Sequence, residues 1–507
     1  MLFLFTTAAL GAPELEPTTD LAFPHDCFRF DRSGVRPLIP NATSLPSALY
    51  PVRIWYDPTH DNSADIVDDV LASVELAWSV QIDTIGFNPP FLPDVADGPE
   101  FDVYLAQELP LSAYVAADWI PDPIPGDGYS SQPSYMVIDY RMPRSLVDGF
   151  VAHEFNHASQ WGYDATELTW PIWEATATAA EKWTLGPDYN WASPVSSFQE
   201  VPYMPTLVGY GSYIWYQLGL GYYFQYGAAM WVLWLDESFG DGAGSAGVEL
   251  WEEAANEGYM LEPDVVDAFE VVSGMDLPSA LASFAVPRFL TGDDWDPRGL
   301  EGADEWGAAR AVPAQPLTAA DLPLVDYAHP AAPHITGQAF VDVDLTLGGL
   351  PKPSTKEALW AVISTSSVDG LQTGLTAMWW GSDGSVGDRI AAGTAPAIEL
   401  PLDGLDRLVI AISNAGPAAW DGDDNPYVPG DQVLSLELEL RGPDTTTPTD
   451  TGTPPDDTGT PPTDTTTPGI IDPPEEKPRG CACTTGGPIP WGWAPGLCLL
   501  GLLLRRR

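Results

Sequence analysis

The sequence predicts an α+β fold followed by a smaller part built from β-strands. Strand-like segments come before a helix-rich stretch that runs to about residue 292, instead of alternating with helices along the whole chain. Short β-forming runs, separated by Gly, Asp, Asn and Pro, then dominate residues 335–442. A chain of 507 residues, 45% of them hydrophobic, is also too long for one ordinary domain and apolar enough for substantial cores.

The first elements are expected in the order strand, helix, strand, strand, helix. Residues 63–81 place apolar side chains at helical spacing, with Ser63 as a candidate N-cap. Residues 145–162 show a second helical pattern, and Gly162 stands where this helix would end. The strands are expected at 50–57 (YPVRIWYD), 101–107 (FDVYLAQ) and 134–141 (SYMVIDYR).

A further helix is expected at 172–183, and most of the chain from there to about residue 292 shows helical patterns. Residues 13–310 therefore form one predicted domain, with a mixed N-terminal sheet, its helices and then a mostly helical half. The β runs of 335–442 predict an antiparallel β-sandwich. This sandwich holds no catalytic set of side chains, so its expected role is binding or spacing.

Both ends of the chain resemble address signals. Residues 1–12 form an apolar run that ends in small residues, typical of a signal peptide without its basic start; a buried first strand is the alternative. Residues 443–479 consist mainly of Thr, Pro, Asp and Gly, which predicts an extended stalk. Residues 480–507 hold a weakly apolar run of about 20 residues before three arginines, close to the minimum for a membrane span.

The last segment also resembles a known sorting signal. GCACTTGG, a short apolar span and the arginine cluster are similar to the MYXO-CTERM tails of myxobacterial surface proteins. The resemblance covers residues 480–507 and implies processing by a sorting machinery at the cysteine motif. The arginines favour a cytoplasmic C-terminus. We therefore expect an exported protein, anchored at the cell surface or outer envelope or released from it.

The formal charge of −52 limits the partners of this chain. A surface so acidic repels nucleic acid and anionic membranes, so no nucleic acid is expected and membrane contact is expected only through the C-terminal tail. The globular part contains one cysteine, Cys27, and therefore no internal disulfide. A thiolate at Cys27 could keep a metal site latent, but a small buried side chain is the favoured interpretation.

The segment VAHEFNHASQW (151–161) carries the strongest chemical signal. His153 and His157 stand four residues apart, so on a helix they share one face and can bind one metal ion. Glu154 lies about 100° round the helix from His153, close enough to hold a water molecule. A catalytic zinc site needs a third protein ligand, and the helix expected at 172–183 offers Glu174. Two histidines bonded locally on an ordinary helix are the alternative interpretation.

HExxH followed by a glutamate in the next helix resembles the gluzincins, zinc peptidases such as thermolysin, hyicolysin and certain aminopeptidases. AHEFNHASQW and WEATATAAE are similar to hyicolysin and to surface metalloproteases of myxobacterial relatives. The resemblance implies a zincin-like fold with one catalytic Zn²⁺, bound by His153, His157 and Glu174. It implies that Glu154 is the general base and that Glu181 supports a ligand histidine.

Tyrosines crowd residues 209–231, which would follow the metal ligands in the helical half. FQYGAAMW resembles a helix start in related aminopeptidases, which marks Tyr226 as the candidate for stabilising the oxyanion; Tyr223 and Tyr210 are rivals. Core packing is the alternative interpretation for each of them. SAYVAADW (112–119) is a candidate edge strand that could bind a peptide substrate through its backbone, or an ordinary loop.

Two further features carry weaker signals. Residues 420–431 (WDGDDNPYVPGD) could hold a structural Ca²⁺, although they lack the spacing of an EF-hand and the acid-rich chain favours a solvated loop. The other four histidines, His25, His60, His329 and His334, show no partner pattern.

The leading functional hypothesis is a surface-anchored zinc endopeptidase that acts on peptides or proteins. An aminopeptidase of the same class is the first alternative. The second alternative is an adhesin or carbohydrate-binding surface protein on a zincin-like fold, which the sandwich and the stalk would suit equally well.

Overall fold

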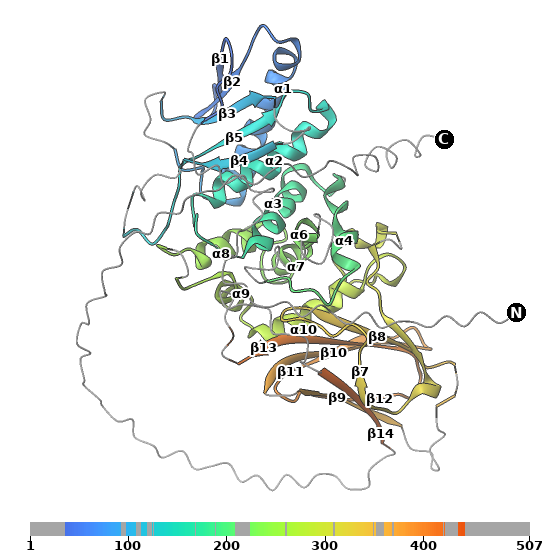
Figure 1. Cartoon of the computed structure of the whole chain (residues 1–507). Helices are drawn as coiled ribbons and strands as arrows, with labels where there is room; N and C mark the ends of the chain where they lie inside the picture. The colour runs from blue at the N-terminus through green and yellow to red at the C-terminus, as the bar shows by residue number, and fades with distance from the viewer. Residues whose placement is uncertain are drawn as a thin grey trace, which may run out of the picture. The chain divides into compact units, whose positions relative to one another are not determined.

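The computed structural model describes most of residues 36–441 (Figure 1). Several expected features lie outside the described residues: the signal segment, Cys27, the calcium-loop candidate beyond Trp420, the stalk and the C-terminal tail. The chain divides into two units, 1–445 and 446–507, and every described residue belongs to the first. The gaps within 36–441 are 93–97, 108–112, 119–123, 125, 168, 188, 208–223, 259–260, 308–309, 348, 351–358, 368–369, 419 and 421–433.

A five-stranded mixed sheet forms the N-terminal part, in the order β1-β2-β3-β5-β4. The inner pairs β2–β3 and β3–β5 are parallel, whereas β1 and β4 pair antiparallel at the two edges. The expected strands are confirmed, and the candidate edge strand is β4. The bounds are β1 Thr43–Pro46, β2 Val52–Tyr56, β3 Phe101–Ala106, β4 Ala113–Ala117 and β5 Ser134–Asp139.

Two long helices, α1 (Asp61–Ala77) and α2 (Arg144–Gln160), pack against this sheet and against each other. The prediction that Ser63 caps α1 is wrong, because His60 is the N-cap and Ser63 is buried within the first turn. The helix was also expected to continue unchanged to residue 81. It instead widens into a π-helix, η1 (Trp78–Ile85), which ends at Gly86 with a left-handed backbone.

Helices follow the sheet, as the strand-then-helix pattern predicted. Helix α3 packs against α2 and α7, and α8 against α9. A core rich in tryptophan joins them: Trp173 contacts Trp251 edge to face, with ring centroids 4.9 Å apart. The bounds are α3 Trp170–Leu185, η2 Asn190–Ala192, α4 Val195–Gln199, α6 Phe224–Gly227, α7 Ala229–Phe239, α8 Ser245–Ala254, α9 Val265–Ser273, α10 Leu277–Phe289, η3 Gly292–Asp294 and η4 Ala303–Glu305.

Two sheets then form a sandwich, in the orders β11-β10-β13-β8-β6 and β12-β9-β14-β7. Their facing sides enclose an aliphatic core. Two strands, β6 and β7, precede residue 335, and β6 pairs parallel with β8, while the other described pairs of these sheets are antiparallel. The bounds are β6 Gln315–Thr318, η6 Ala319–Asp321, β7 Leu324–Ala328, β8 Gln338–Asp344, β9 Trp360–Ser367, β10 Leu371–Gly381, β11 Val386–Gly393, β12 Ala397–Pro401, β13 Leu405–Pro417 and β14 Leu434–Arg441.

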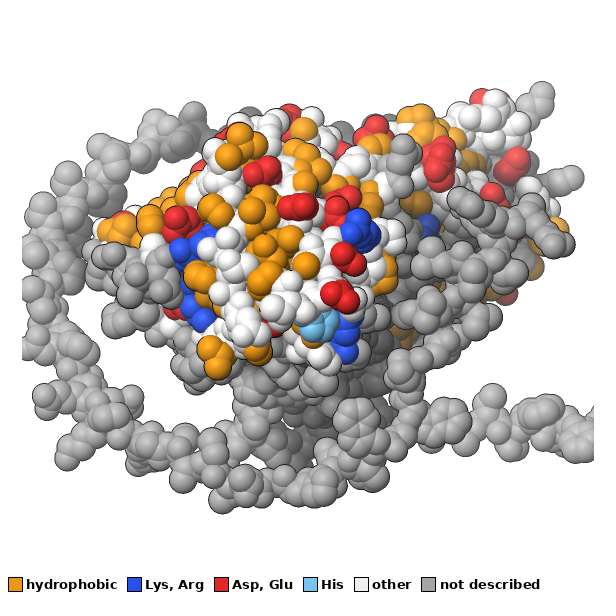
Figure 2. Space-filling model, turned by 90° about the horizontal axis from the view of Figure 1, so that it is seen from above, with side chains coloured by type: hydrophobic (Ala, Val, Ile, Leu, Met, Phe, Trp, Pro, Cys, Tyr) orange, Lys and Arg blue, Asp and Glu red, His pale blue; other side chains and the backbone are white. Residues whose placement is uncertain are grey.

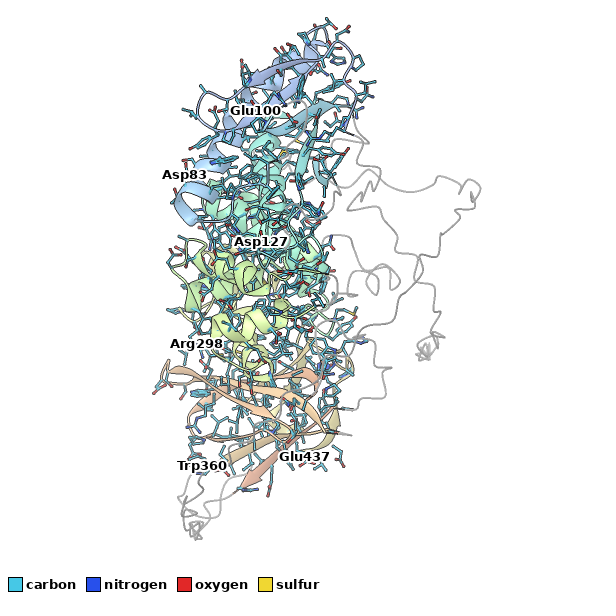
Figure 3. The ribbon with its side chains drawn as sticks, turned by 90° about the vertical axis from the view of Figure 1, so that its left-hand side faces the viewer. Asp83, Glu100, Asp127, Arg298, Trp360 and Glu437 are labelled. Carbon is cyan, nitrogen blue, oxygen red and sulfur yellow. The ribbon has the colours of Figure 1, made fainter. Side chains whose placement is uncertain are left out.

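Helix α10 covers the outer side of the first sandwich sheet, where Phe340, Met378 and Val409 meet its apolar face. Arg288 of α10 is fully buried there and donates hydrogen bonds to the side chains of Gln199 and Gln338 and to two backbone carbonyls. Arg298, labelled in Figure 3, follows α10. It pairs with Asp388 of β11 at 3.0 Å. The sandwich is therefore packed against the helical half.

On the side of the N-terminal sheet, hydrophobic side chains lie among acidic and a few basic ones at the surface (Figure 2). Within the described residues, no single helix has the length and hydropathy needed to span a membrane. Helices α9 and α10 meet the criterion only when taken together, as a pair bent by 74°.

Candidate metal centre

Helices α2 and α3 bring the predicted metal ligands together. Every α2 residue from Val151 to Gln160 is buried, because the sheet with α1 covers one side of the helix and α3 covers another. Pro171 stands in the first turn of α3, where its fixed φ favours helix initiation. Helix α3 begins at Trp170, two residues earlier than expected, so Glu174 lies one turn into the helix and faces the two histidines.

His153, His157 and Glu174 form a compact group of three possible ligands whose donor atoms all lie within 4.8 Å of one another. Nε2 of His153 lies 2.9 Å from Oε2 of Glu174 and 3.2 Å from Nε2 of His157. Nε2 of His157 lies 3.5 Å from the same carboxylate oxygen. In a tetrahedral zinc site with bonds of about 2.0–2.2 Å, neighbouring ligand atoms are separated by about 3.3 Å. The donor set and its spacing therefore fit one metal ion.

Each histidine is held at its other ring nitrogen. Nδ1 of His153 lies 2.9 Å from Oε1 of Glu181, two turns after Glu174 on α3. Nδ1 of His157 lies 2.7 Å from Oε1 of Gln160, three residues on along α2. Such partners fix the tautomer and the ring orientation of metal-binding histidines. Glu181 therefore lies beside His153, one of the candidate metal ligands.

The charges of the group compensate one another. Burial would lower the pKa of His153, but hydrogen bonds to Glu174 and Glu181 outweigh it and raise this pKa well above the usual value. Burial would raise the pKa of Glu174, but the two histidines outweigh it and lower this pKa to about 2. Burial also raises the pKa of Glu181, against the opposing effect of His153.

The two predicted catalytic side chains border this group. Glu154 is buried, and its burial raises the pKa of its carboxyl group, while His157 and His153 act in the opposite direction. The half-buried Tyr226 of α6 stacks on His153, with ring centroids 5.4 Å apart and an interplanar angle of 29°. Tyr223 and Tyr210 lie outside the described residues.

Sequence reasoning missed three carboxamides beside the ligands: Gln81, Asn156 and Gln160. All three are fully buried. Hydrogen bonds link them one after another, from Gln81 in the π-helix η1 through Asn156 and Gln160 to His157. Two of them lie within the segment HEFNHASQ, and helical spacing alone places Gln160 one turn after His157. Gln81 has no such signal, because only the fold brings η1 against α2.

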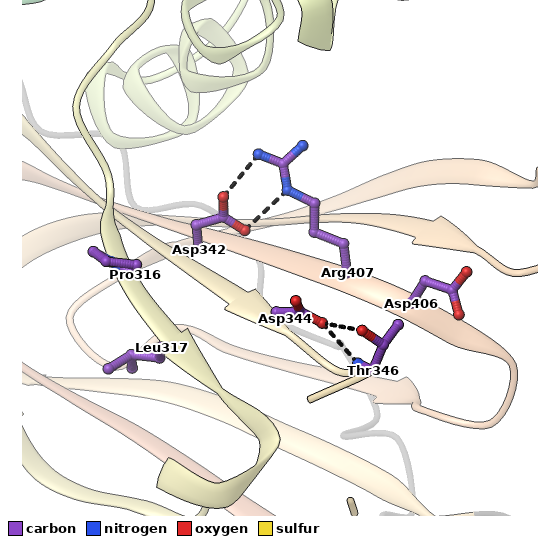
Figure 4. A pocket seen from close by; sticks show the side chains of 7 residues that line it. All are labelled: Pro316, Leu317, Asp342, Asp344, Thr346, Asp406 and Arg407. Carbon is purple, nitrogen blue, oxygen red and sulfur yellow. Dashed lines mark hydrogen bonds and ion pairs between the residues drawn. The ribbon is translucent and has the colours of Figure 1, made fainter. Parts of the chain in front are cut away.

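Charged side chains also gather away from this group, among other places at the start of α9 and on the sandwich. Glu262, Asp264 and Asp267 lie within 4.8 Å of one another at the start of α9, two of them exposed. A cavity of about 360 Å³ opens on the sandwich, lined by Pro316, Leu317, Asp342, Asp344, Thr346, Asp406 and Arg407 (Figure 4). Arg407 makes a double hydrogen bond with Asp342 there. The candidate ligands His153 and His157 lie elsewhere, on α2.

Comparisons with known proteins leave the family open. No protein-family model matches the chain, and no curated protein matches it in sequence. Among solved structures, the chain is similar to aminopeptidase A of Legionella pneumophila in complex with aspartic acid, with 13% identity and a TM-score of 0.31. The match covers 72% of this chain and 36% of the other, so the chain spans just over a third of that protein's length. The site must be interpreted from its own geometry.

Proposed function

We propose that the chain is a zinc-dependent endopeptidase that acts outside the cytoplasm. The observation that carries this proposal is the convergence of His153, His157 and Glu174 with donor spacings of 2.9, 3.2 and 3.5 Å. Two imidazoles and one carboxylate form the ligand set of catalytic zinc in peptidases, which keep one coordination position open.

Bound zinc lowers the pKa of water toward neutrality and polarises a carbonyl group. Glu154, next to ligand His153 in the sequence, takes the proton of the attacking water on its carboxylate and delivers it to the leaving amine. Its burial suits the role of general base, since a carboxylate with a raised pKa takes a proton from water more readily. Tyr226 donates its hydroxyl proton in a hydrogen bond to the carbonyl oxygen as negative charge develops there.

Strand β4 gives the substrate a place to bind. It is an edge strand of the N-terminal sheet, and α2, which carries the site, packs against it. An extended peptide that pairs with β4 through its backbone would present successive peptide bonds to the site, and such a mode does not require a free N-terminus. This geometry favours internal cleavage over aminopeptidase activity.

Anchoring remains part of the proposal and rests on sequence alone. The signal-like start, the Thr/Pro/Asp stalk and the cysteine motif with its arginine cluster suit an exported protein held at the envelope. Detection of the mature chain on intact cells by a protease-accessible tag before the stalk would test this part separately from catalysis.

The test of the enzymatic proposal compares the full chain with Glu154→Gln. We expect one zinc per chain in both proteins and casein hydrolysis by the wild type alone, with a loss of about 10²–10⁴-fold in the variant. A panel of peptides with blocked and free N-termini then separates endopeptidase from aminopeptidase activity. Zinc binding without hydrolysis of any substrate would favour a binding protein on this fold, and absence of zinc would overturn the proposal.

A further inference from the structure

The three carboxamides beside the site form one continuous hydrogen-bonded chain. Nδ1 of His157 faces Oε1 of Gln160 at 2.7 Å, and Nε2 of Gln160 donates to Oδ1 of Asn156 at 2.9 Å. Nδ2 of Asn156 donates to Oε1 of Gln81 at 3.3 Å. The chain ends where Nε2 of Gln81 donates to Oγ1 of Thr184 at 3.1 Å. Its members come from α2, η1 and α3.

Two backbone carbonyls determine the direction of this chain. Nε2 of Gln160 also lies 3.1 Å from the carbonyl oxygen of Trp173, and Nε2 of Gln81 lies 2.8 Å from that of Ala152. A carbonyl oxygen only accepts hydrogen bonds, so the amide nitrogens of both glutamines must point toward these carbonyls. The amide oxygen of Gln160 then faces His157, whose Nδ1 must carry a proton. His157 is left to present Nε2 toward Glu174.

The same contacts reach the backbone beside the other two ligands. Ala152 precedes His153, and Trp173 precedes Glu174. Gln81 therefore fixes the chain next to the first ligand, whereas Gln160 bridges the second ligand and the helix that carries the third. The π-helix η1 places Gln81 in this position, and π-helical turns inside helices often occur at functional sites.

We propose that Gln81, Asn156 and Gln160 are positioning residues that hold all three metal ligands in register and fix the tautomer of His157. This inference rests on the proposed metal site. Hydrogen bonds aligned in one direction polarise one another, so the chain also makes His157 a stronger electron donor than a single amide would. Removal of a partner of this kind from a metal-binding histidine weakens metal binding by about 10- to 100-fold.

The test measures zinc affinity of the full chain by competition with a chelator at fixed pH. Gln160→Met keeps the size of the side chain and removes its hydrogen bonds, and we expect a loss of zinc affinity of about 10- to 100-fold. Gln81 contacts no ligand side chain, so a several-fold loss of zinc affinity in Gln81→Met would come from breaking the chain of hydrogen bonds. Gln199→Met is the matched control: Gln199 is equally buried and bonds to Arg288 instead, so its zinc affinity should equal that of the wild type.

A second readout needs no metal. Nuclear magnetic resonance of ¹⁵N-labelled histidine should show a protonated Nδ1 on His157 in the metal-free wild type, and loss of this signature in Gln160→Met. Equal zinc affinity in all variants, with thermal stability lowered alike in Gln160→Met and Gln199→Met, would overturn the inference and leave the metal site standing. A wild-type chain that binds no zinc would overturn the inference together with the proposed function.

Discussion

The metal centre and the sandwich cavity both gather charged side chains, but they neutralise them differently. Glu174 is 2% exposed, and its partners are two histidines. Glu181 holds the other ring nitrogen of His153, and the amide of Gln160 holds that of His157. In the cavity, the side chains of Arg407 and Asp342 are 29% and 28% exposed and pair directly with each other (Figure 4). Buried polar groups need complete hydrogen bonding, whereas exposed ion pairs contribute little. Only the first arrangement leaves ligand atoms converging on one point.

The largest effect should follow removal of a ligand. Glu174→Gln keeps the shape of the side chain but removes its charge, and zinc affinity should fall by more than about 100-fold. Glu181→Gln on the same helix should lower it by only about 10-fold, because Glu181 contacts the histidine and not the metal position. Equal losses in the two variants, measured by chelator competition, would contradict the assignment of Glu174 as the ligand.

The buried Arg288 extends the comparison to a cation with neutral partners. Burial lowers the pKa of Arg288 to about 9, and the two glutamines and two carbonyls are its described acceptors. Arg288→Met should destabilise the fold by about 2–4 kcal/mol, since these acceptors would lose their donor inside the protein. Arg298 is half-buried, but water reaches both it and its partner Asp388, so Arg298→Met should cost about 1 kcal/mol or less. Denaturant unfolding measures the change. A higher free energy of unfolding in Arg288→Met would show that the desolvation cost of Arg288 outweighs its hydrogen bonds.

A buried carboxyl group with no cation beside it among the described residues should make stability depend on pH. Burial, with Asp164 nearby, raises the pKa of Glu167 from 4.5 to about 8. The folded chain then keeps a proton that the unfolded chain has lost, so this contribution to stability decreases as pH rises from 4.5 to 8. The slope is roughly 1.4 kcal/mol per pH unit. Glu167→Gln should remove this slope in unfolding curves measured from pH 5 to 8. An unchanged slope would show that the pKa of Glu167 is not raised in the folded chain.

Local patterns predicted much of the fold. Period-2 and period-3.6 spacing located the first strands and helices, and the β-rich segment 335–442 contains β13, with the run RLVIAISN that lacks polar alternation. That run also indicates a strand covered on both faces, as α10 and the second sheet cover it. The π-helix at 78–85 and the parallel pairing of β6 with β8 were not predicted, because packing between distant segments decides them.

The ligands were predictable because two histidines one turn apart share a face whatever surrounds them. The supporting amides were not, because their role depends on contacts between α2, α3 and η1. Gln81 and Asn156 are separated by 75 positions along the chain, and nothing local to Gln81 distinguishes it from a surface glutamine. Chemistry held within one helix can be inferred from sequence, whereas support from other elements requires the fold.

The smallest effect is expected at the cavity of the sandwich. Arg407→Gln removes the double hydrogen bond to Asp342 and the contact with Asp294, yet all three side chains reach solvent. Because water can replace an exposed partner, the free energy of unfolding should change by about 1 kcal/mol or less, and high salt should reduce the difference. Zinc affinity should not change, since α2 and α3 carry every ligand. A change in zinc affinity would mean that the sandwich and the metal centre are coupled, and the contrast between them would have to be abandoned.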